Sequence, residues 1–261
     1  MSNQNLNSVM FTTAVITMAL LISIPQTNAK QTFYNSLDSE KAVKAGGGTV
    51  HGGSFEEAAL GNGFVADAVG EALSFPTDKH IQLEAGTIAL WVKVLFPILK
   101  QPTESFIFLS YFRGNDAWFI NHSHAWQSKG ICWMIKNNGK WHEQGATCSK
   151  DLDWDVGETH FIACTWGPEG MHLFLDGKLA AKGGFKEGPA KLDNDFWVGN
   201  IDIDVVPGRT LFSKWLQDEL YIFDNQLNQA EVEQLMKSSL AVEAADKLAA
   251  TWGTIKTGRL K

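Results

Sequence analysis

The stretch THFIACTWGPEGMHLFLDGKLAAKG, from Thr159 to Gly183, decides the fold. Two short runs rich in β-forming residues, at 160–166 and 171–175, are separated by a Gly-Pro-Glu-Gly turn, and a second tight turn follows at Asp176-Gly177. Short apolar runs joined by Asp-Gly and by glycine-bounded turns are typical of β-hairpins. The spacing therefore predicts consecutive antiparallel strands.

Other runs on both sides of this stretch also predict strands. In GTIALWVKVLF, which begins at Gly86, large aliphatic side chains on one face alternate with Ala89, Trp91 and Lys93 on the other. Alternation with a period of two is the signature of a strand, and it gives this one a wholly apolar face and a mixed face. Further strands are expected at 32–37, 49–55, 105–111, 117–120, 131–136, 196–200 and 215–223, the first two as edge strands joined by a loose turn.

One helix is expected near the C-terminus. Asn228 precedes the segment and Glu231 follows three residues later, which is the spacing of a capping box. Residues 241–261 form a helical and then basic tail. This tail either extends the domain or frays as a terminus.

Length and composition indicate one globular domain. The chain has 261 residues, and the part that remains after removal of a leader suits a single β-sandwich; 44% hydrophobic residues supply a full core. The formal net charge is −7, and no clustered basic run with interleaved aromatic residues is present. Nucleic acid is therefore excluded as a partner, because phosphate binding requires concentrated positive charge.

The first 29 residues predict export. They carry no charged side chain and contain the apolar run 9–24, followed by Pro25 and a small-residue end at Ala29. This pattern is typical of a secretory signal cleaved after Ala29, and an uncleaved membrane anchor is the alternative. No later segment has the apolar length of a transmembrane helix. We expect a secreted, periplasmic or cell-surface protein.

Three cysteines follow the leader. Cys132 and Cys148 lie at comparable distances on either side of the hairpin signal Asn138-Gly139, which predicts a disulfide across that hairpin. Such a crosslink contributes about 3 kcal/mol by restricting the unfolded chain. Cys164 lies within the apolar run FIACTW and is expected to be a small buried residue rather than a nucleophile.

The strand and turn patterns resemble a known family. The Thr-Trp and Asp-Gly strand endings in 159–177, the segment GTIALWVK, the strand FWVGN and the closing segment WLQDELYIFDNQLNQAEVEQL are similar to the laminin-G-like, concanavalin A-like lectin and glucanase domains. This resemblance covers roughly residues 31–240. It implies an all-β fold, a two-sheet antiparallel jelly-roll sandwich with a short C-terminal helix.

The resemblance implies recognition more than catalysis. We expect a non-catalytic module that binds carbohydrate or another extracellular polymer through aromatic rings, which stack on the apolar faces of sugars. The candidate ligand-binding residues are Trp91, Trp118, Trp126, Trp133, His122 and His124. Tryptophan is buried on average, so a core position is the alternative for each strand residue.

A structural Ca²⁺ is the expected inorganic partner. The first and last strands of such domains lie side by side, and members often bind Ca²⁺ through oxygen ligands from both. Asp38 and Asp218 best match those positions. His122 and His124 have a spacing that also suits a transition metal, but no third ligand is evident, which favours solvated histidines.

Enzymes on the same scaffold are the alternative reading. Asp153, Asp155 and Glu158 imitate the carboxylate spacing of related endo-glucanases, except that the first acid is an aspartate and a glycine precedes the last. A lyase would need a base and a charge neutraliser, for which Tyr111, Arg113 and His122 are the clustered candidates. A protein–protein adhesion module is a third reading.

Overall fold

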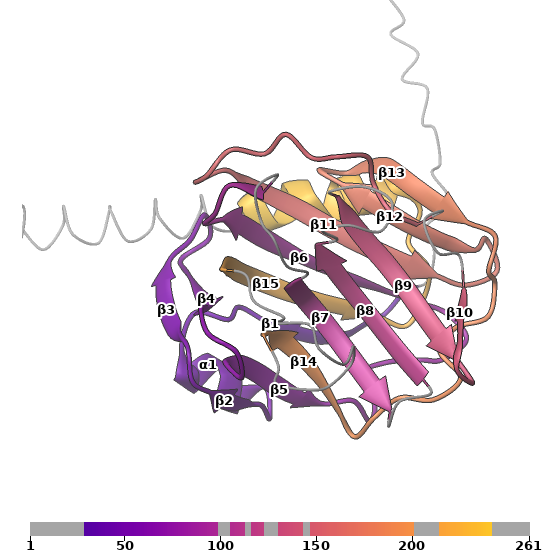
Figure 1. Cartoon of the computed structure of the whole chain (residues 1–261), viewed down its shortest axis with the longest axis horizontal. Helices are drawn as coiled ribbons and strands as arrows, with labels where there is room; N and C mark the ends of the chain where they lie inside the picture. The colour runs from indigo at the N-terminus through magenta and orange to yellow at the C-terminus, as the bar shows by residue number, and fades with distance from the viewer. Residues whose placement is uncertain are drawn as a thin grey trace, which may run out of the picture.

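The computed structural model describes residues 29–98, 105–112, 116–122, 130–142, 147–200 and 214–241. The chain forms two antiparallel sheets packed face to face (Figure 1). The sandwich confirms the fold class expected from the sequence. None of the helices in the described ranges has the length and apolar character needed to cross a lipid bilayer.

The eight-stranded sheet has the order β13-β12-β11-β6-β15-β4-β3, and β1 pairs with β15 beside this path. Its central strands include the hairpin that the sequence predicted, because β11 pairs antiparallel with both β12 and β6. Its strands are β1 (Gln31–Asn35), β3 (Ser54–Glu57), β4 (Asn62–Ala66), β6 (Gly86–Val94), β11 (Thr159–Trp166), β12 (Met171–Leu175), β13 (Lys178–Gly183) and β15 (Trp215–Phe223).

The seven-stranded sheet has the order β10-β9-β8-β7-β14-β5-β2. In Figure 1 its strands β7, β8 and β9 lie side by side on the side of the molecule nearest the viewer. Its strands are β2 (Thr49–His51), β5 (Ala72–Pro76), β7 (Ser105–Phe112), β8 (Asp116–His122), β9 (Ile131–Asn137), β10 (Lys140–His142) and β14 (Asp195–Gly199).

The N-terminal segment contains a helix that the sequence did not predict. Between β1 and β2, where we expected a loose turn, α1 (Glu40–Ala45) forms one and a half turns. Ser39 caps it by accepting a hydrogen bond from the Ala42 amide, and buried Val43 anchors it to the core. A six-residue helix gives too short a pattern for its apolar period to be seen.

The main core lies between the two sheets. On β6, Ile88, Leu90 and Val92 point into it, and Ala89 and Trp91 point to the other side of the sheet, so the predicted alternation is confirmed. Trp118, Trp133 and Trp166 meet at the centre, with ring centroids 4.5 to 6.0 Å apart. Burial of such large rings dominates the stabilising free energy of a core.

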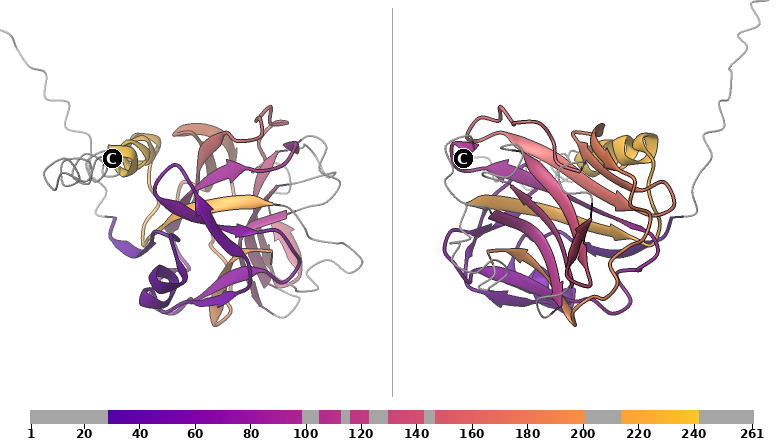
Figure 2. Two further views of the ribbon diagram at one scale, coloured as in Figure 1. Left: turned by 90° about the vertical axis from the view of Figure 1, so that its left-hand side faces the viewer. Right: turned by 45° about the vertical axis from the view of Figure 1, so that its right-hand side comes forward.

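A helical segment at residues 229–241 covers the outer face of the eight-stranded sheet (Figure 2, left, yellow). Its start confirms the predicted capping box, because the Asn228 amide donates to Glu231 Oε2 at 2.9 Å and the Glu231 amide donates to Asn228 Oδ1 at 3.2 Å. The helix buries Val232, which packs with Phe161 and Trp91 of the sheet.

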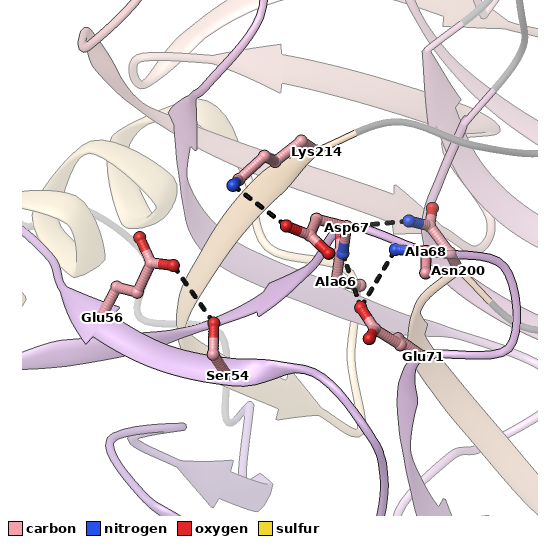
Figure 3. A network of polar contacts seen from close by, with 8 residues as sticks. All are labelled: Ser54, Glu56, Ala66, Asp67, Ala68, Glu71, Asn200 and Lys214. Atoms are coloured by element: carbon pink, nitrogen blue, oxygen red, sulfur yellow. Dashed lines mark hydrogen bonds and ion pairs between the residues drawn. The ribbon is translucent and has the colours of Figure 1, made fainter.

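The crossover from β4 to β5, which carries the chain from one sheet to the other, is fixed by a polar network (Figure 3). Glu71 Oε2 accepts hydrogen bonds from the amides of Asp67 and Ala68, at 2.8 and 3.0 Å. Lys214 Nζ pairs with Asp67 Oδ2 at 3.1 Å, and Asn200 Nδ2 donates to the Ala66 carbonyl. The ends of β14 and β15 are thereby tied to the crossover.

Candidate functional site

The structure places the predicted strand tryptophans in the interior. Trp118 and Trp133 are fully buried between the sheets, and the ring of Trp91 lies beneath the C-terminal helix, where its Nε1 donates to Ser239 Oγ at 3.1 Å. These rings cannot stack on a sugar, so their assignment as ligand-binding residues is wrong. Trp133 was placed on the correct strand, but its side chain faces the core.

The predicted histidines do not form an exposed pair. His122 is the last residue of β8 and is buried between the sheets, beside the rings of Phe96 and Trp215. Its expected role as an exposed ligand-binding residue is therefore wrong. His124, Trp126 and Arg113 lie outside the described residues, as does the side chain of Tyr111.

Aromatic side chains do gather on the outer face of the seven-stranded sheet. We call this surface the aromatic face. Half-buried Trp141 and Trp197 pack there against a buried layer. The members of that layer are Ala72, Ala117, Phe119, Cys132 and Met134, with partly buried Cys148 beside them.

Each of these two tryptophans has polar groups at its side. The His51 ring lies 4.9 Å from the Trp197 ring, and His51 Nε2 is 2.9 Å from Ser74 Oγ. Lys136 Nζ lies 5.4 Å from the centre of the Trp141 ring, within the range of a cation–π contact. An indole face flanked by hydrogen-bonding groups is the chemistry that recognises a sugar ring.

Sequence reasoning did not select Trp197, although a signal was present. Phe196, Trp197 and Val198 lie in one short strand, and alternation requires the middle side chain to face away from its neighbours. The structure buries Phe196 and Val198 in the core and leaves Trp197 on the outer face.

The predicted disulfide is present between Cys132 and Cys148. It joins β9 to the segment after β10, and the Ser149 amide donates to the Ile131 carbonyl beside it. The crosslink lies on the aromatic face and fixes the edge of the sheet that carries Trp141. Cys164 is buried as expected, and burial raises the pKa of its thiol well above the ordinary value.

A second polar region lies where β15 changes partner. Residues 215–217 pair with β4, and residues 220–223 pair with β1, so the first and last strands are neighbours as predicted. The register shifts between Asp218 and Tyr221, and Glu219 has a φ of 54°. Such bulges re-aim side chains beside functional sites.

This bulge brings carboxylates together. Asp218 is 1% exposed, its Oδ2 accepts from the Leu60 amide at 3.3 Å, and its Oδ1 has no hydrogen-bond partner among the described residues. Burial, followed by the charges of Glu219 and Asp38, raises the pKa of Asp218 to about 9. A carboxyl group in this setting either holds a proton or faces a cation.

Asp38 and Glu219 line an adjoining cavity of about 460 Å³. Gly61 packs against Asp38 so closely that an added Cβ would lie 2.5 Å from Asp38 Oδ1. Glu219 accepts hydrogen bonds from Tyr34 and Tyr221, at 3.2 and 2.7 Å. Burial and the charge of Glu219 raise the pKa of both phenols, which keeps them as donors.

The oxygen donors of this region suit a hard cation such as Ca²⁺. Asp218 offers a free buried oxygen, and Asp38 lies close enough to raise its pKa. Among the described residues, no three acidic, histidine or cysteine side chains converge tightly enough to hold an ion by themselves. Backbone carbonyls or water would therefore complete the coordination of an ion held by Asp38 and Asp218.

The acids that imitate a glycosidase form a turn instead. Glu158 Oε2 accepts from the Asp155 amide at 2.8 Å, and the Glu158 amide donates back to the Asp155 carbonyl. His160 stacks flat on Trp154, with ring centroids 3.8 Å apart, and pairs with Asp176 at 2.9 Å. Asp153 is exposed and does not line the cavity beside Asp38 and Glu219. These contacts give the segment a structural role.

Several solved structures share this fold. Domain 4 of AbnA, an extracellular arabinanase from Geobacillus stearothermophilus in complex with arabinotriose, matches with a TM-score of 0.57 and 17% identity, covering 80% of this chain and 98% of that one. The receptor-binding domain of botulinum neurotoxin D matches with a TM-score of 0.56 and 15% identity over 80% of this chain, which spans about half (52%) of that structure.

The ligand-binding domain of the same toxin serotype in complex with N-acetylneuraminic acid matches with a TM-score of 0.52 and 15% identity, covering 73% of this chain and 45% of that one. At these identities the likeness concerns the fold. No curated protein matches this chain in sequence. The family model of the concanavalin A-like lectin/glucanases superfamily matches residues 67–233, more than half of the sequence. The chain therefore belongs to the concanavalin A-like lectin/glucanase superfamily.

Proposed function

We propose that this protein is an exported, non-catalytic recognition module that binds a carbohydrate or another extracellular polymer on the aromatic face. The observation that carries this proposal is the pair of half-buried tryptophans, Trp141 and Trp197, on one outer sheet face. Two structural neighbours, an arabinanase domain and a toxin domain, are complexes with sugars, which supports the same ligand class.

The spacing of the two rings suits an extended chain. Trp197 is on β14 and Trp141 is on β10, four strand intervals apart in the sheet order. At about 4.8 Å per interval, their strands lie about 19 Å apart. The Trp141 ring packs against Phe119 on β8, at a centroid distance of 5.4 Å, which shortens the span. A polymer that crosses the strands can contact both rings.

Export follows from the leader and the crosslink together. Residues 1–29 have the composition of a secretory signal and lie, apart from Ala29, outside the described residues. Structural disulfides persist in oxidising compartments, and Cys132–Cys148 is one. We therefore place the mature chain, beginning at Lys30, outside the cytoplasm.

Affinity electrophoresis of the mature protein through gels that contain arabinan, xylan, mannan, β-glucan or pectin tests this proposal. We expect at least one polymer to retard the protein and Trp197→Ala to abolish the retardation, because the stacking surface is removed. Trp154→Ala is the matched control, because Trp154 is also half-buried but packs against the main core and stacks on His160 of β11, in the other sheet.

Equal retardation of wild type and Trp197→Ala would contradict the aromatic face as the binding surface. Release of reducing ends or unsaturated products during the assay would instead establish an enzyme. Binding to cell-surface proteins, with no retardation by any polysaccharide, would establish the adhesion module.

We also infer that Asp38 and Asp218 hold a structural Ca²⁺. The buried free oxygen of Asp218, and the charge of Asp38 close enough to raise its pKa, support this inference. An ion there would replace the proton on Asp218 and bind the first strand to the last. It would stabilise the fold and take no part in chemistry.

The pH dependence of stability tests the ion. Without Ca²⁺, Asp218 has a folded pKa of about 9 and an ordinary unfolded pKa near 4, so the folded state binds the extra proton between these values. In the presence of a chelator, we expect the free energy of unfolding to be highest at low pH and to fall as pH rises toward 9. Added Ca²⁺ should restore it at pH 8.

Asp218→Asn should flatten this pH dependence and remove the response to Ca²⁺. The matched control is Asp153→Asn, because Asp153 is an exposed acid that makes no described contact. If Ca²⁺ and chelator gave wild type the same melting temperature at pH 8, the calcium inference would fail.

A further inference from the structure

A cavity of about 700 Å³ opens at the edge of the sandwich, next to strand β10. It is separate from the aromatic face and from the cavity lined by Asp38 and Glu219, which we call the acidic cavity. We call the new one the rim cavity. A cavity of this size is typical of small-ligand sites. Its walls come from three segments: residues 83–84, the β9–β10 turn with β10, and the connection at 186–190.

The first wall is the β9–β10 turn. Asn138 and Gly139 have φ values of 49° and 78°, as a two-residue hairpin turn requires. The Asn138 amide donates to Asp116 Oδ1 at 2.6 Å, which ties the turn to the start of β8. Behind His142, the ring of Phe185 stacks at 4.0 Å with an interplanar angle of 23°, which holds the imidazole in place.

The second wall is the connection between β13 and β14. The buried side chain of Asn137 holds it at two points, because Nδ2 donates to the Gly188 carbonyl at 3.0 Å and Oδ1 accepts from the Ala190 amide at 2.9 Å. Both hydrogen-bonding ends of this amide are therefore used to position backbone. Asn137 is a positioning residue for the cavity.

The third wall is residues 83–84. The indole Nε1 of the core residue Trp166 is 3.2 Å from the carbonyls of both Gln82 and Leu83. Gly188 lies close to the Leu83 carbonyl, because a Cβ added at Gly188 would lie 1.6 Å from the Leu83 oxygen. The three walls are thus anchored to the core before any ligand arrives, which lowers the entropic cost of binding.

The anchoring contacts use buried groups and leave the charged groups at the mouth unused. In the described part of the chain, no ion pair or hydrogen bond engages the side chains of Lys140, Lys186, Glu84 and Glu187, all of which are exposed. Two ammonium donors and two carboxylate acceptors leave no net charge at the mouth. Leu83 and Pro189 add apolar surface.

We propose that the rim cavity is a second binding site, which takes the end of a neutral sugar chain. Each hydroxyl of a sugar both donates and accepts hydrogen bonds, so it can use carboxylates and ammonium groups at once. The ring CH groups match Leu83 and Pro189. Because the two lysines balance the two glutamates, an anionic sugar gains no net attraction at the mouth, and the formal net charge of −7 on the chain disfavours it.

The position of the cavity connects it to the aromatic face. Along β10, Lys140 and His142 line the cavity, and the intervening Trp141 lies on the aromatic face, because side chains alternate across a strand. A chain that crosses the aromatic face can therefore end around this edge strand. The site adds to the proposed function, and its own contacts do not include Trp197.

Nuclear magnetic resonance titration of the mature protein tests the site with arabinotriose, xylotriose, mannotriose and cellotriose, and with trigalacturonate as the anionic probe. We expect at least one neutral trisaccharide to shift the amide signals of Gly139 and Gly188, with weaker binding by trigalacturonate. Trp197→Ala should leave these shifts in place, which separates this site from the aromatic face.

The variant Glu84→Gln with Glu187→Gln removes both acceptor charges and keeps both lysines. We expect it to weaken binding of the neutral trisaccharide by about tenfold and to strengthen binding of trigalacturonate. Glu57→Gln, at an exposed glutamate on β3 in the other sheet, is the matched control and should change neither.

The proposal is overturned if no trisaccharide moves the Gly139 and Gly188 signals, or if trigalacturonate binds wild type more tightly than every neutral probe. It is also overturned if the double glutamine variant and Glu57→Gln bind the neutral probe with equal affinity. Loss of polymer binding in Trp197→Ala, with these shifts intact, would support both sites separately.

Discussion

The outer faces of both sheets carry aromatic residues, but one face is covered by a helix and the other remains partly exposed. On the eight-stranded sheet, Trp91 and Phe161 are covered by the helix at 229–241 (Figure 2). On the seven-stranded sheet, Trp141 and Trp197 remain half-buried over Phe119. The difference shows that an aromatic residue on a mixed strand face becomes core or stays partly exposed according to what packs on it later in the chain.

The two faces are also held by different means. The covered face gains its stability from helix packing, and its helix ends beside the acidic cavity through Leu235, Ser238 and Ser239. The aromatic face has a covalent bond, Cys132–Cys148, within its buried layer. A crosslink stabilises this face and leaves Trp141 and Trp197 partly exposed, whereas a covering helix would bury them.

The largest effect should separate the two faces directly. Trp91→Ala removes a buried ring together with its hydrogen bond to Ser239, and we expect it to lower the free energy of unfolding by about 3–5 kcal/mol. Trp197→Ala removes a half-buried ring and should cost about 1 kcal/mol. Urea unfolding measures the free energy of unfolding of both variants. Equal losses would contradict the difference between the covered face and the aromatic face.

The crosslink of the aromatic face should have the next largest effect. We expect the double variant Cys132→Ala with Cys148→Ala to lose about 3 kcal/mol of unfolding free energy, because the unfolded chain gains freedom. A reductant should destabilise wild type to the same level and leave the double variant unchanged. Sensitivity of the double variant to reductant would show that another thiol, such as Cys164, is responsible.

The cap of the covering helix should have the smallest effect. Asn228→Ala removes one partner of the capping box and should cost about 1 kcal/mol. Hydrogen exchange should speed up most in residues 229–241 and in the sheet beneath them, including Trp91. The control is Asn194→Ala, at an exposed asparagine that caps no helix. Faster exchange of residues 229–241 in this control would show that the effect is non-specific.

The strands could be predicted because their signals are local. Alternation assigned the two faces of β6 correctly, the Asp176-Gly177 turn defined the hairpin of β12 and β13, and the capping box placed the start of the last helix. The helix α1 was missed because six residues carry too little periodicity. Its formation depends on tertiary burial of Val43, which no local pattern encodes.

The site could be predicted only in part, because it depends on contacts between distant segments. Pairing of the first and last strands, inferred from the family resemblance, brings Asp38 near Asp218 as expected. No local pattern indicates that two tyrosines donate hydrogen bonds to Glu219. Trp91 was misassigned because the helix that covers it lies about 140 residues later. The rim cavity joins three separate segments, which no motif links.

The place of β15 in its sheet has a consequence for synthesis of the chain. Among the described strands it is the last in the sequence, yet it lies between β6 and β4 and also pairs with β1. A ribosome-bound chain that ends before Trp215 therefore presents two unfilled strand edges inside one sheet, and such edges invite pairing with other chains. The eight-stranded sheet can therefore be completed only after residues 215–223 have emerged.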